Sequence, residues 1–396
     1  MGGDKLTIQL YDQTDEEMHP VSFGAKASIY TCGITPYDSS HLGHVTTFTY
    51  FDVLVRLLMS HGIDVTLVRN VTDLDDPLFQ RVRETKEPLE ELVKRNVSQL
   101  DEDLLSLNCI APTFEPYSSQ FVPQMIEAIS LLLEKGEAYS VDGWTYFDTQ
   151  KRESFPEFEI LRQKSSTELL DIACERGVDR NDPRIKNSLD FVLWKPSADD
   201  EPSFQAPFGN GRPGWHIECS VMAIELLGNT IDVHGGGDDL LFPHHACEVS
   251  QSESLTGVSF VNHFMHVAPV AYQGEKMSKS LGNLVYADSI IREIGEMCTR
   301  MMLLSHHYRE GYEYTQEDAQ LAQERCAQWS QGLSDFDAES KPGNVYEDVR
   351  KALEFDLNTP LAMELIDKAV NTLKSDQQNN DLKADILSAK MLLGFK

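Results

Sequence analysis

The stretch ASIYTCGITPYDSSHLGH, residues 27–44, decides the predicted fold, because a β-rich run there ends at a glycine turn before an apolar segment begins. Residues 44–61 carry the pattern of a buried helix, which Gly62 ends, and residues 64–71 form a second β-rich run. A strand, a turn, a helix and a second strand in this order predict a parallel βαβ unit. The chain is therefore expected to have an α/β fold built on a parallel sheet.

The rest of the chain separates into segments with different patterns. Residues 78–140 have apolar residues at helical spacing, whereas residues 141–205 are irregular and charged. We interpret the irregular segment as an insertion between two halves of the α/β domain. Residues 230–237 and 260–272 are predicted strands, and residues 286–396 are expected to be helical.

The charge of the chain limits its partners. Lys and Arg number 34 and Asp and Glu 64 among 396 residues, which gives a net charge of −30. A long polyanion is usually held by a basic surface, so no stable nucleic-acid partner is expected. The seven cysteines are scattered and do not form the pattern of a disulfide framework. No apolar run suits a membrane span and no signal peptide is evident, so a cytoplasmic protein without a membrane partner is expected.

Two histidines and two lysines are candidates for binding phosphate. His41 and His44 stand at the expected start of the first helix, where free N–H groups and the helix dipole favour anions. Lys276 and Lys279 belong to EKMSKSLGN, residues 275–283, a cationic loop that suits a leaving pyrophosphate. Each pair alone is a weak signal, since surface histidines and solvated lysines are common. Together they resemble the two motifs of class I aminoacyl-tRNA synthetases, which implies attack of a carboxylate on the α-phosphate of ATP.

Four further side chains could hold zinc: Cys32, Cys219, His244 and Glu248. His244 and Glu248 are four residues apart, so they share a face if this segment is helical. Two thiolates, an imidazole and a carboxylate suit zinc in kind and number, with Cys247 as an alternative to Glu248. Ligands this far apart in sequence favour a catalytic zinc with an open position, which would prefer the thiol of cysteine to the hydroxyl of serine. The other reading is a set of unrelated buried residues.

Seven motifs together resemble the cysteinyl-tRNA synthetase lineage of class I synthetases over nearly the whole chain. They are CGITPYDSSHLGH, RNVTDLDD, FVLWKPS, GRPGWHIECS, DVHGGGDDLLFPHH, EKMSKSLGN and LLSHHYRE. The resemblance implies a Rossmann-like parallel sheet with an inserted connective region and a C-terminal helical bundle. It divides the chain into the first half of the Rossmann catalytic domain (1–109), a mostly helical connective insertion (110–205), the second half of that domain with the lysine loop (206–285) and the bundle (286–396).

The resemblance also implies roles for individual residues. Zinc, one ion per subunit, would be held by Cys32, Cys219, His244 and Glu248, and Mg²⁺ would accompany ATP. His41, His44, Lys276 and Lys279 would act catalytically on the phosphates. Trp215 would close over the cysteine. A cysteinyl-adenylate would be lined by Cys32, Gly33, Ile34, Thr35, Thr47, Asn70, Val71, Thr72, Trp215, Gly237, Asp238, Asp239 and Val270.

The lineage has two branches, which transfer activated cysteine to different acceptors. One is the tRNA synthetase, and the other is a ligase of mycothiol biosynthesis that joins cysteine to the amine of glucosaminyl-inositol and releases AMP and pyrophosphate. Pro36, the DDPLF run at 75–79, CERGVDR at 174–180 and the end of the chain just after the helical bundle resemble the ligase branch. Glu248 and KNSLDFVLW at 186–194 resemble the synthetase branch.

We therefore predict a monomeric ligase whose substrates are ATP, L-cysteine and glucosaminyl-inositol. Two alternatives remain active enzymes: a cysteinyl-tRNA synthetase without its C-terminal anticodon-binding region, and a cysteine ligase for another amine. A third is a non-catalytic nucleotide-binding paralogue. The intact HLGH and KMSKS sequences argue against the third, because a mere binder has no use for a pyrophosphate-release loop.

Overall fold

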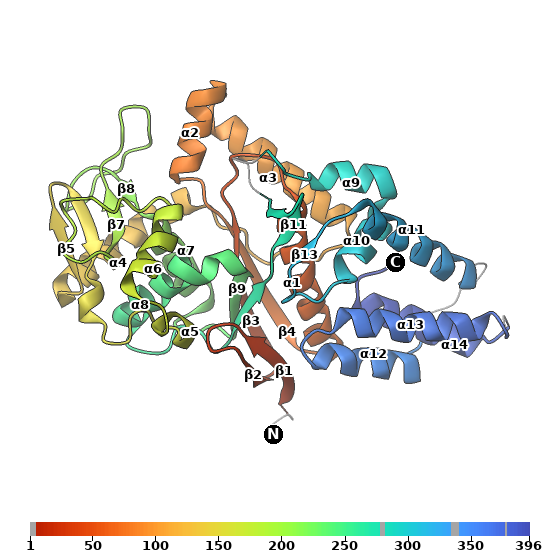
Figure 1. Ribbon diagram of the computed structural model, residues 1–396. Helices are drawn as coiled ribbons and strands as arrows, with labels where there is room; N and C mark the ends of the chain where they lie inside the picture. Colours follow the sequence, from red (N-terminus) through yellow and green to blue (C-terminus); the bar gives the residue numbers. More distant parts are fainter. Residues whose placement is uncertain (1–4, 278–281, 334–339, 377) are drawn as a thin grey trace.

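The computed structural model (Figure 1) describes residues 5–277, 282–333, 340–376 and 378–396. Its centre is a four-stranded sheet in which every neighbouring pair of strands is parallel. This sheet confirms the predicted α/β fold. The strand order is β10-β9-β3-β4, with β3 at Lys26–Ile34, β4 at Asp64–Val71, β9 at Val233–Gly237 and β10 at Phe264–Val267.

The first connection of the sheet is the helix α1 (Leu42–Ser60), which joins β3 to β4. This helix is buried along most of its length between the sheet and helices of the C-terminal half, which explains its continuous apolar pattern. Gly33 near the end of β3 is required by the close approach of β4, because a Cβ there would lie 1.6 Å from the carbonyl oxygen of Asn70. Because α1 begins soon after the carboxyl end of β3 and the strands are parallel, the start of α1 and the carboxyl ends of the strands lie at the same edge of the sheet.

An N-terminal hairpin precedes the sheet, formed by the antiparallel strands β1 (Leu6–Asp12) and β2 (Glu17–Phe23). The sequence analysis did not predict it. Pro20 stands inside β2, and a proline lowers the strand signal of any short run. The hairpin contacts the strand β10 and a helix of the C-terminal bundle, so it lies against both the central sheet and the bundle.

The insertion contains a second sheet that the sequence analysis missed. Its strands are antiparallel in the order β5-β6-β7-β8, and Figure 1 shows them on the opposite side of the central sheet from the C-terminal helices. The expectation of a mostly helical insertion with an irregular 141–205 segment left these strands out, because runs of two to five residues give no clear alternation. The insertion contains α4 (Val122–Lys135), β5 (Ala138–Val141), β6 (Trp144–Phe147), α5 (Glu159–Arg162), α6 (Ser166–Glu175) and β7 (Phe191–Lys195). Beyond residue 205, β8 (Arg212–Pro213) completes this sheet, and the helices α7 (Trp215–Leu227) and α8 (Ala246–Thr256) follow.

Two helices follow β4, α2 (Asp76–Thr85) and α3 (Leu89–Ser106), as the helical spacing predicts. The run 260–272, expected as one strand, is two: β10 ends at Val267 and β11 (Val270–Tyr272) belongs to a small separate sheet with β12 (Glu275–Lys276) and β13 (Tyr312–Glu313). Pro269 lies at the break, where it cannot donate to a sheet. The described C-terminal helices are α9 (Ala287–Ile294), α10 (Glu296–Leu304), α11 (Gln316–Gly332), α12 (Asn344–Glu354), α13 (Thr359–Leu373) and α14 (Asn380–Leu392).

A buried ion pair joins this bundle to α1. Arg300 in α10 is fully buried and pairs with Asp52 of α1. The same guanidinium donates to the carbonyl oxygens of Leu393 at 2.6 Å and Leu107 at 2.8 Å. Within the described ranges no helix is both long and apolar enough to cross a membrane.

Candidate metal and nucleotide site

Four side chains with metal-binding atoms meet at the carboxyl edge of the central sheet. Cys32 comes from β3, Cys219 from α7, and His244 and Glu248 from the start of α8 and the turn before it. Their four donor atoms all lie within 4.8 Å of one another. The Cys32 Sγ is 3.9 Å from the Cys219 Sγ and 3.7 Å from the Glu248 Oε1, which is 3.1 Å from the His244 Nε2. The structure thus brings together the four residues that the sequence analysis grouped, whereas Cys247 lies outside this group.

A second donor set overlaps the first. Cys32 and Glu248 also lie within 4.8 Å of the ring nitrogens of His234 and His245. His234 belongs to β9, and His245 directly follows His244. The sequence analysis did not select these two histidines, although DVHGGG and FPHH contain them. The missing information was spatial, because β9 runs beside β3 and carries His234 opposite Tyr30.

The protonation of these groups tests whether they suit a cation. Glu248 is fully buried and Cys32 is 6% exposed. Burial, followed by the neighbouring Cys219 thiol, raises the pKa of Cys32 well above its ordinary value, and burial also raises the pKa of Glu248. The His234 Nδ1 lies 3.0 Å from the Tyr30 carbonyl oxygen and so carries the proton, which leaves the lone pair of Nε2 facing the Glu248 carboxyl at 3.3 Å. The buried thiol and carboxyl therefore hold their protons, and a cation that displaced these protons would meet sulfur, nitrogen and oxygen donors in a combination that fits zinc.

Further contacts orient the histidine ligand candidate. The His244 Nδ1 lies 2.9 Å from the His216 Nδ1, and burial lowers the pKa of His216 to about 3. With a metal on the His244 Nε2, the His244 proton would lie on Nδ1, and the neutral His216 Nδ1 would accept it. The ring of Trp215 stacks on His244 with 4.3 Å between the ring centres. Trp215 therefore lies beside the donor cluster, and its closure over the cysteine stays a prediction.

The two candidate phosphate-binding histidines lie at the start of α1. His41 is the residue before the helix, and its ring stacks on that of His44 with 3.8 Å between centres. The His41 backbone N–H points to the His44 Nδ1 at 3.4 Å, which leaves the His44 Nε2 as the proton donor. Burial, followed by the charge of His41, lowers the pKa of His44 well below its ordinary value. A Cβ on Gly43 would lie 3.0 Å from the His41 ring, so a small residue is needed for the stack itself.

The remaining predicted contact residues mostly follow the ends of parallel strands. Gly33 donates its N–H to the Asn70 side chain at 2.8 Å, and Asn70 donates to the Thr72 hydroxyl at 3.1 Å, which ties the ends of β3 and β4 together. Asp239, just beyond β9, pairs with Arg176 of the insertion at 2.9 Å. The others occupy the following places: Ile34 and Thr35 end or follow β3, Val71 ends β4, Gly237 ends β9, Asp238 follows it, Thr47 lies in α1 and Val270 is buried in β11.

The structure describes only part of the loop that carries the two lysines. Lys276 lies in β12, where its backbone pairs with Ala271 of β11. Lys279 lies outside the described residues, as does most of the KMSKS run. The proposed phosphate contacts of both lysines therefore remain predictions.

A parallel sheet with a histidine pair at its first helix and metal donors at its carboxyl edge defines a nucleotide-binding protein of the class I synthetase type. Solved structures agree on the fold. Mycobacterium tuberculosis methionyl-tRNA synthetase in complex with methionyl-adenylate superimposes with a TM-score of 0.66 at 15% identity, covering 93% of this chain and 89% of that one. The LeuRS of a ternary complex with tRNA and LeuAMS from Agrobacterium radiobacter superimposes with a TM-score of 0.62 at 12% identity, covering 93% of this chain and 83% of that one.

The family is defined by sequence. The model for the tRNA synthetases class I (C) catalytic domain matches residues 19–324, and the chain belongs to this family. The L-cysteine:1D-myo-inositol 2-amino-2-deoxy-alpha-D-glucopyranoside ligase of Acidothermus cellulolyticus is 38% identical over 96% of this chain and 93% of its own length. The ligase of the same name from Corynebacterium kroppenstedtii is 37% identical over 95% of this chain and 74% of its own length.

The tRNA branch matches about equally well. The cysteine–tRNA ligase of Haemophilus influenzae is 39% identical over 93% of this chain and 81% of its own length. The chain is thus a ligase of the class I synthetase family, and its resemblance to the cysteine-ligase lineage is confirmed. Identity alone does not separate the two acceptors.

Proposed function

We propose that this ligase activates L-cysteine with ATP at the donor cluster and transfers it to the amine of glucosaminyl-inositol. The observation that carries the first step is the convergence of Cys32, Cys219, His244 and Glu248 in a sheet whose first helix begins with the histidine pair. When bound there, zinc would supply a Lewis-acidic position that prefers a thiolate to a hydroxyl. The four side chains would hold and orient that ion.

In the activation step the cysteine carboxylate would attack the α-phosphate of ATP, forming a carboxylate–phosphorus bond and releasing pyrophosphate. His41 and His44 would donate to the phosphate oxygens as charge develops, and Mg²⁺ would accompany the nucleotide. Lys276 and Lys279 would follow the leaving pyrophosphate. Thr72 and Asn70 would line the cysteinyl-adenylate, with Asp238 and Asp239 at its ribose and Val270 at its adenine.

In the transfer step the acceptor amine would attack the adenylate carbonyl, forming an amide and releasing AMP. Three observations support the amino sugar as acceptor: Pro36 in the first motif, the DDPLF run and the net charge of −30. The acidity disfavours a long polyanion. Transfer to tRNA is the second candidate, favoured by Glu248 in the donor cluster and by the similarity to the cysteine–tRNA ligase.

The acceptor is tested by measuring AMP release from ATP and cysteine after adding glucosaminyl-inositol or cysteine tRNA in separate reactions. The proposal predicts stimulation by the amino sugar, with a cysteine amide of that sugar as the product in mass spectrometry. Stimulation by tRNA alone would contradict the amino-sugar proposal and identify the second candidate. Serine in place of cysteine serves as the control and is expected to give no stimulation.

A further inference from the structure

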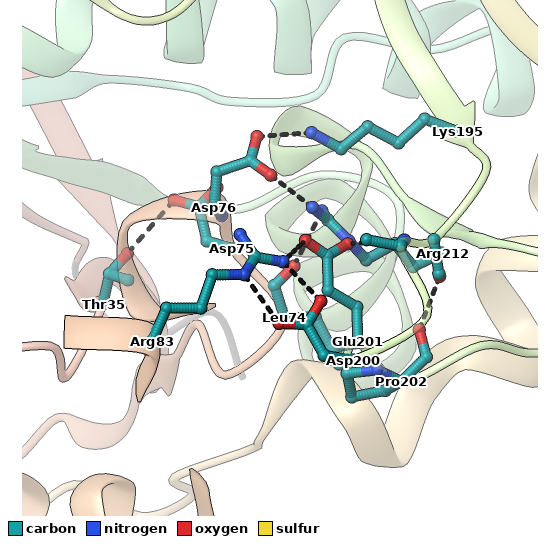
Figure 2. Close-up of polar contacts among 12 residues, drawn as sticks. Thr35, Leu74, Asp75, Asp76, Arg83, Lys195, Asp200, Glu201, Pro202 and Arg212 are labelled. Atoms are coloured by element: carbon teal, nitrogen blue, oxygen red, sulfur yellow. Dashed lines mark hydrogen bonds and ion pairs between the residues drawn. The ribbon is translucent and has the colours of Figure 1, made fainter. Parts of the chain in front are cut away.

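Six charged residues form a network between α2 and the insertion, and neither the metal site nor the phosphate site uses them. Figure 2 shows their contacts. Two of them, Lys195 and Arg212, stand in the motifs FVLWKPS and GRPGWHIECS, and neither of these two residues was given a role above. Three cations balance three anions in this Arg212 network, which consists of Asp76, Arg83, Lys195, Asp200, Glu201 and Arg212.

Arg212 is the inner member of the network. Its side chain is 3% exposed, and all three of its guanidinium nitrogens have partners. It donates to the Leu74 carbonyl oxygen at 3.2 Å, to Glu201 at 2.9 Å and to Asp76. A planar fork with fixed donor directions is needed to reach three acceptors from one side chain, which a lysine cannot do.

The outer members form a second layer. Arg83 in α2 binds Asp200 through two hydrogen bonds of 2.7 and 2.8 Å, and it shares Glu201 with Arg212. The Arg83 side chain is 43% exposed and that of Asp200 is 56% exposed, so solvent screens this pair. Lys195 on β7 pairs with Asp76 and lies opposite Arg212 in the antiparallel sheet.

Arg212 and two of its partners lie on two different segments that each lead to a predicted site residue. Leu74 and Asp76 belong to the corner after β4, directly beyond Thr72, and the Thr72 backbone N–H is bonded to Ile34 of β3 at 2.9 Å. Trp215 follows Arg212 by three residues and stacks on His244. Arg212 therefore joins the corner that carries Thr72 to the strand that leads into Trp215.

We propose that Arg212 is a positioning residue for cysteine binding, which holds the Thr72 corner and the Trp215 segment at the separation that one cysteine requires. It touches neither substrate nor metal and acts through Leu74 and Asp76. This inference rests on the proposed activation of cysteine. The residues expected to hold the phosphates and the adenosine, at the start of α1 and beyond β9, are not members of the Arg212 network, so loss of Arg212 is expected to weaken cysteine binding selectively.

The test is cysteine-dependent ATP–pyrophosphate exchange by Arg212→Met and Arg212→Lys in the full chain. Arg212→Met is expected to raise the KM for cysteine about tenfold, since small displacements of positioning groups have large kinetic effects, while the KM for ATP stays within about twofold. Arg212→Lys is expected to recover part of the loss because it keeps the charge next to Asp76. Arg83→Met is the matched control, and its KM for cysteine is expected to stay within about twofold because its main pair is exposed.

A purely structural role would give a different result. It would lower the active fraction and hence kcat, and leave the KM for cysteine unchanged in the folded protein. That outcome would overturn the inference while leaving cysteine activation intact. If Arg212→Met does not fold, Asp76→Asn tests the same contact, and an unchanged KM for cysteine in that variant would equally overturn it. Absence of cysteine-dependent exchange in the wild-type protein would instead overturn the proposed function, and the inference with it.

Discussion

At the scale of single residues, the site depends on groups whose protons are fixed by their neighbours. The His234 Nδ1 is committed to the Tyr30 carbonyl oxygen, and the His244 Nδ1 to His216. Both rings therefore direct Nε2 towards Glu248, whose carboxyl lies in a fully buried position. A cation bound between these donors would replace the proton that burial keeps on Glu248, and His216 would then fix the orientation of the His244 ligand.

The role of His216 can be measured directly. Replacing it in His216→Ala removes the acceptor for the His244 Nδ1 proton, so zinc affinity is expected to fall about tenfold to a hundredfold. Competition with a chromogenic chelator gives the affinity. His19→Ala is the control, since His19 pairs only with Asp15 on the N-terminal hairpin, with 39% of its side chain exposed. Wild-type zinc affinity in His216→Ala would show that His216 does not orient the ligand.

Residue patterns predicted part of this site and left part of it out. Cys32, Cys219, His244 and Glu248 were found because thiolates, imidazole and carboxylate are the donors that zinc prefers. His234 and His245 were not found, because the sequence does not show that they lie close to Cys32 and Glu248. That proximity depends on the parallel pairing of β9 with β3. The pairing of Asp76 with Lys195 and Arg212 was equally invisible, since these residues are more than a hundred positions apart.

At the scale of elements, the helix α1 connects the site with the C-terminal bundle. Its first turn carries His41 and His44, and further along the helix Asp52 pairs with the buried Arg300 of α10. Asp52 also accepts a hydrogen bond from the Ile110 backbone at 2.7 Å, so three segments meet at one carboxylate. The orientation of the turn that carries His41 and His44 therefore depends on the packing of α10.

The buried pair of Arg300 and Asp52 is expected to contribute strongly to the free energy of unfolding. Arg300→Met leaves Asp52 buried with only Arg56 as a charged partner, and removing one member of a buried pair costs about 3–5 kcal/mol of unfolding free energy. Urea denaturation measures the change. Arg292→Met is the comparison, because Arg292 is 72% exposed and its pair with Asp288 is expected to contribute at most about 1 kcal/mol. Equal effects of the two substitutions would contradict the account.

Elements were predicted best where the periodicity is long. The helix α1 and the strands β3 and β4 agree with the sequence patterns, because each is long and either continuously apolar or β-rich. The hairpin β1–β2 and the sheet β5–β8 were missed. Their strands are short, one contains Pro20, and their pairing is set by contacts that a single strand does not encode.

At the scale of the whole molecule, fold and charge address different questions. The parallel sheet and the family match define a class I ligase, and both cysteine branches share that architecture. The charge of −30 bears on the choice of acceptor, because it opposes the phosphates of a long nucleic acid and does not oppose an amino sugar.

The central claim, that the donor cluster selects and activates cysteine, is tested most directly by ATP–pyrophosphate exchange with cysteine and with serine, in the wild-type protein and in Cys219→Ala. The account predicts exchange with cysteine and none with serine in the wild-type protein with bound zinc. It also predicts loss of both zinc and exchange in Cys219→Ala, with Cys326→Ala of the C-terminal bundle unchanged. Full cysteine-dependent exchange by Cys219→Ala without zinc would contradict it.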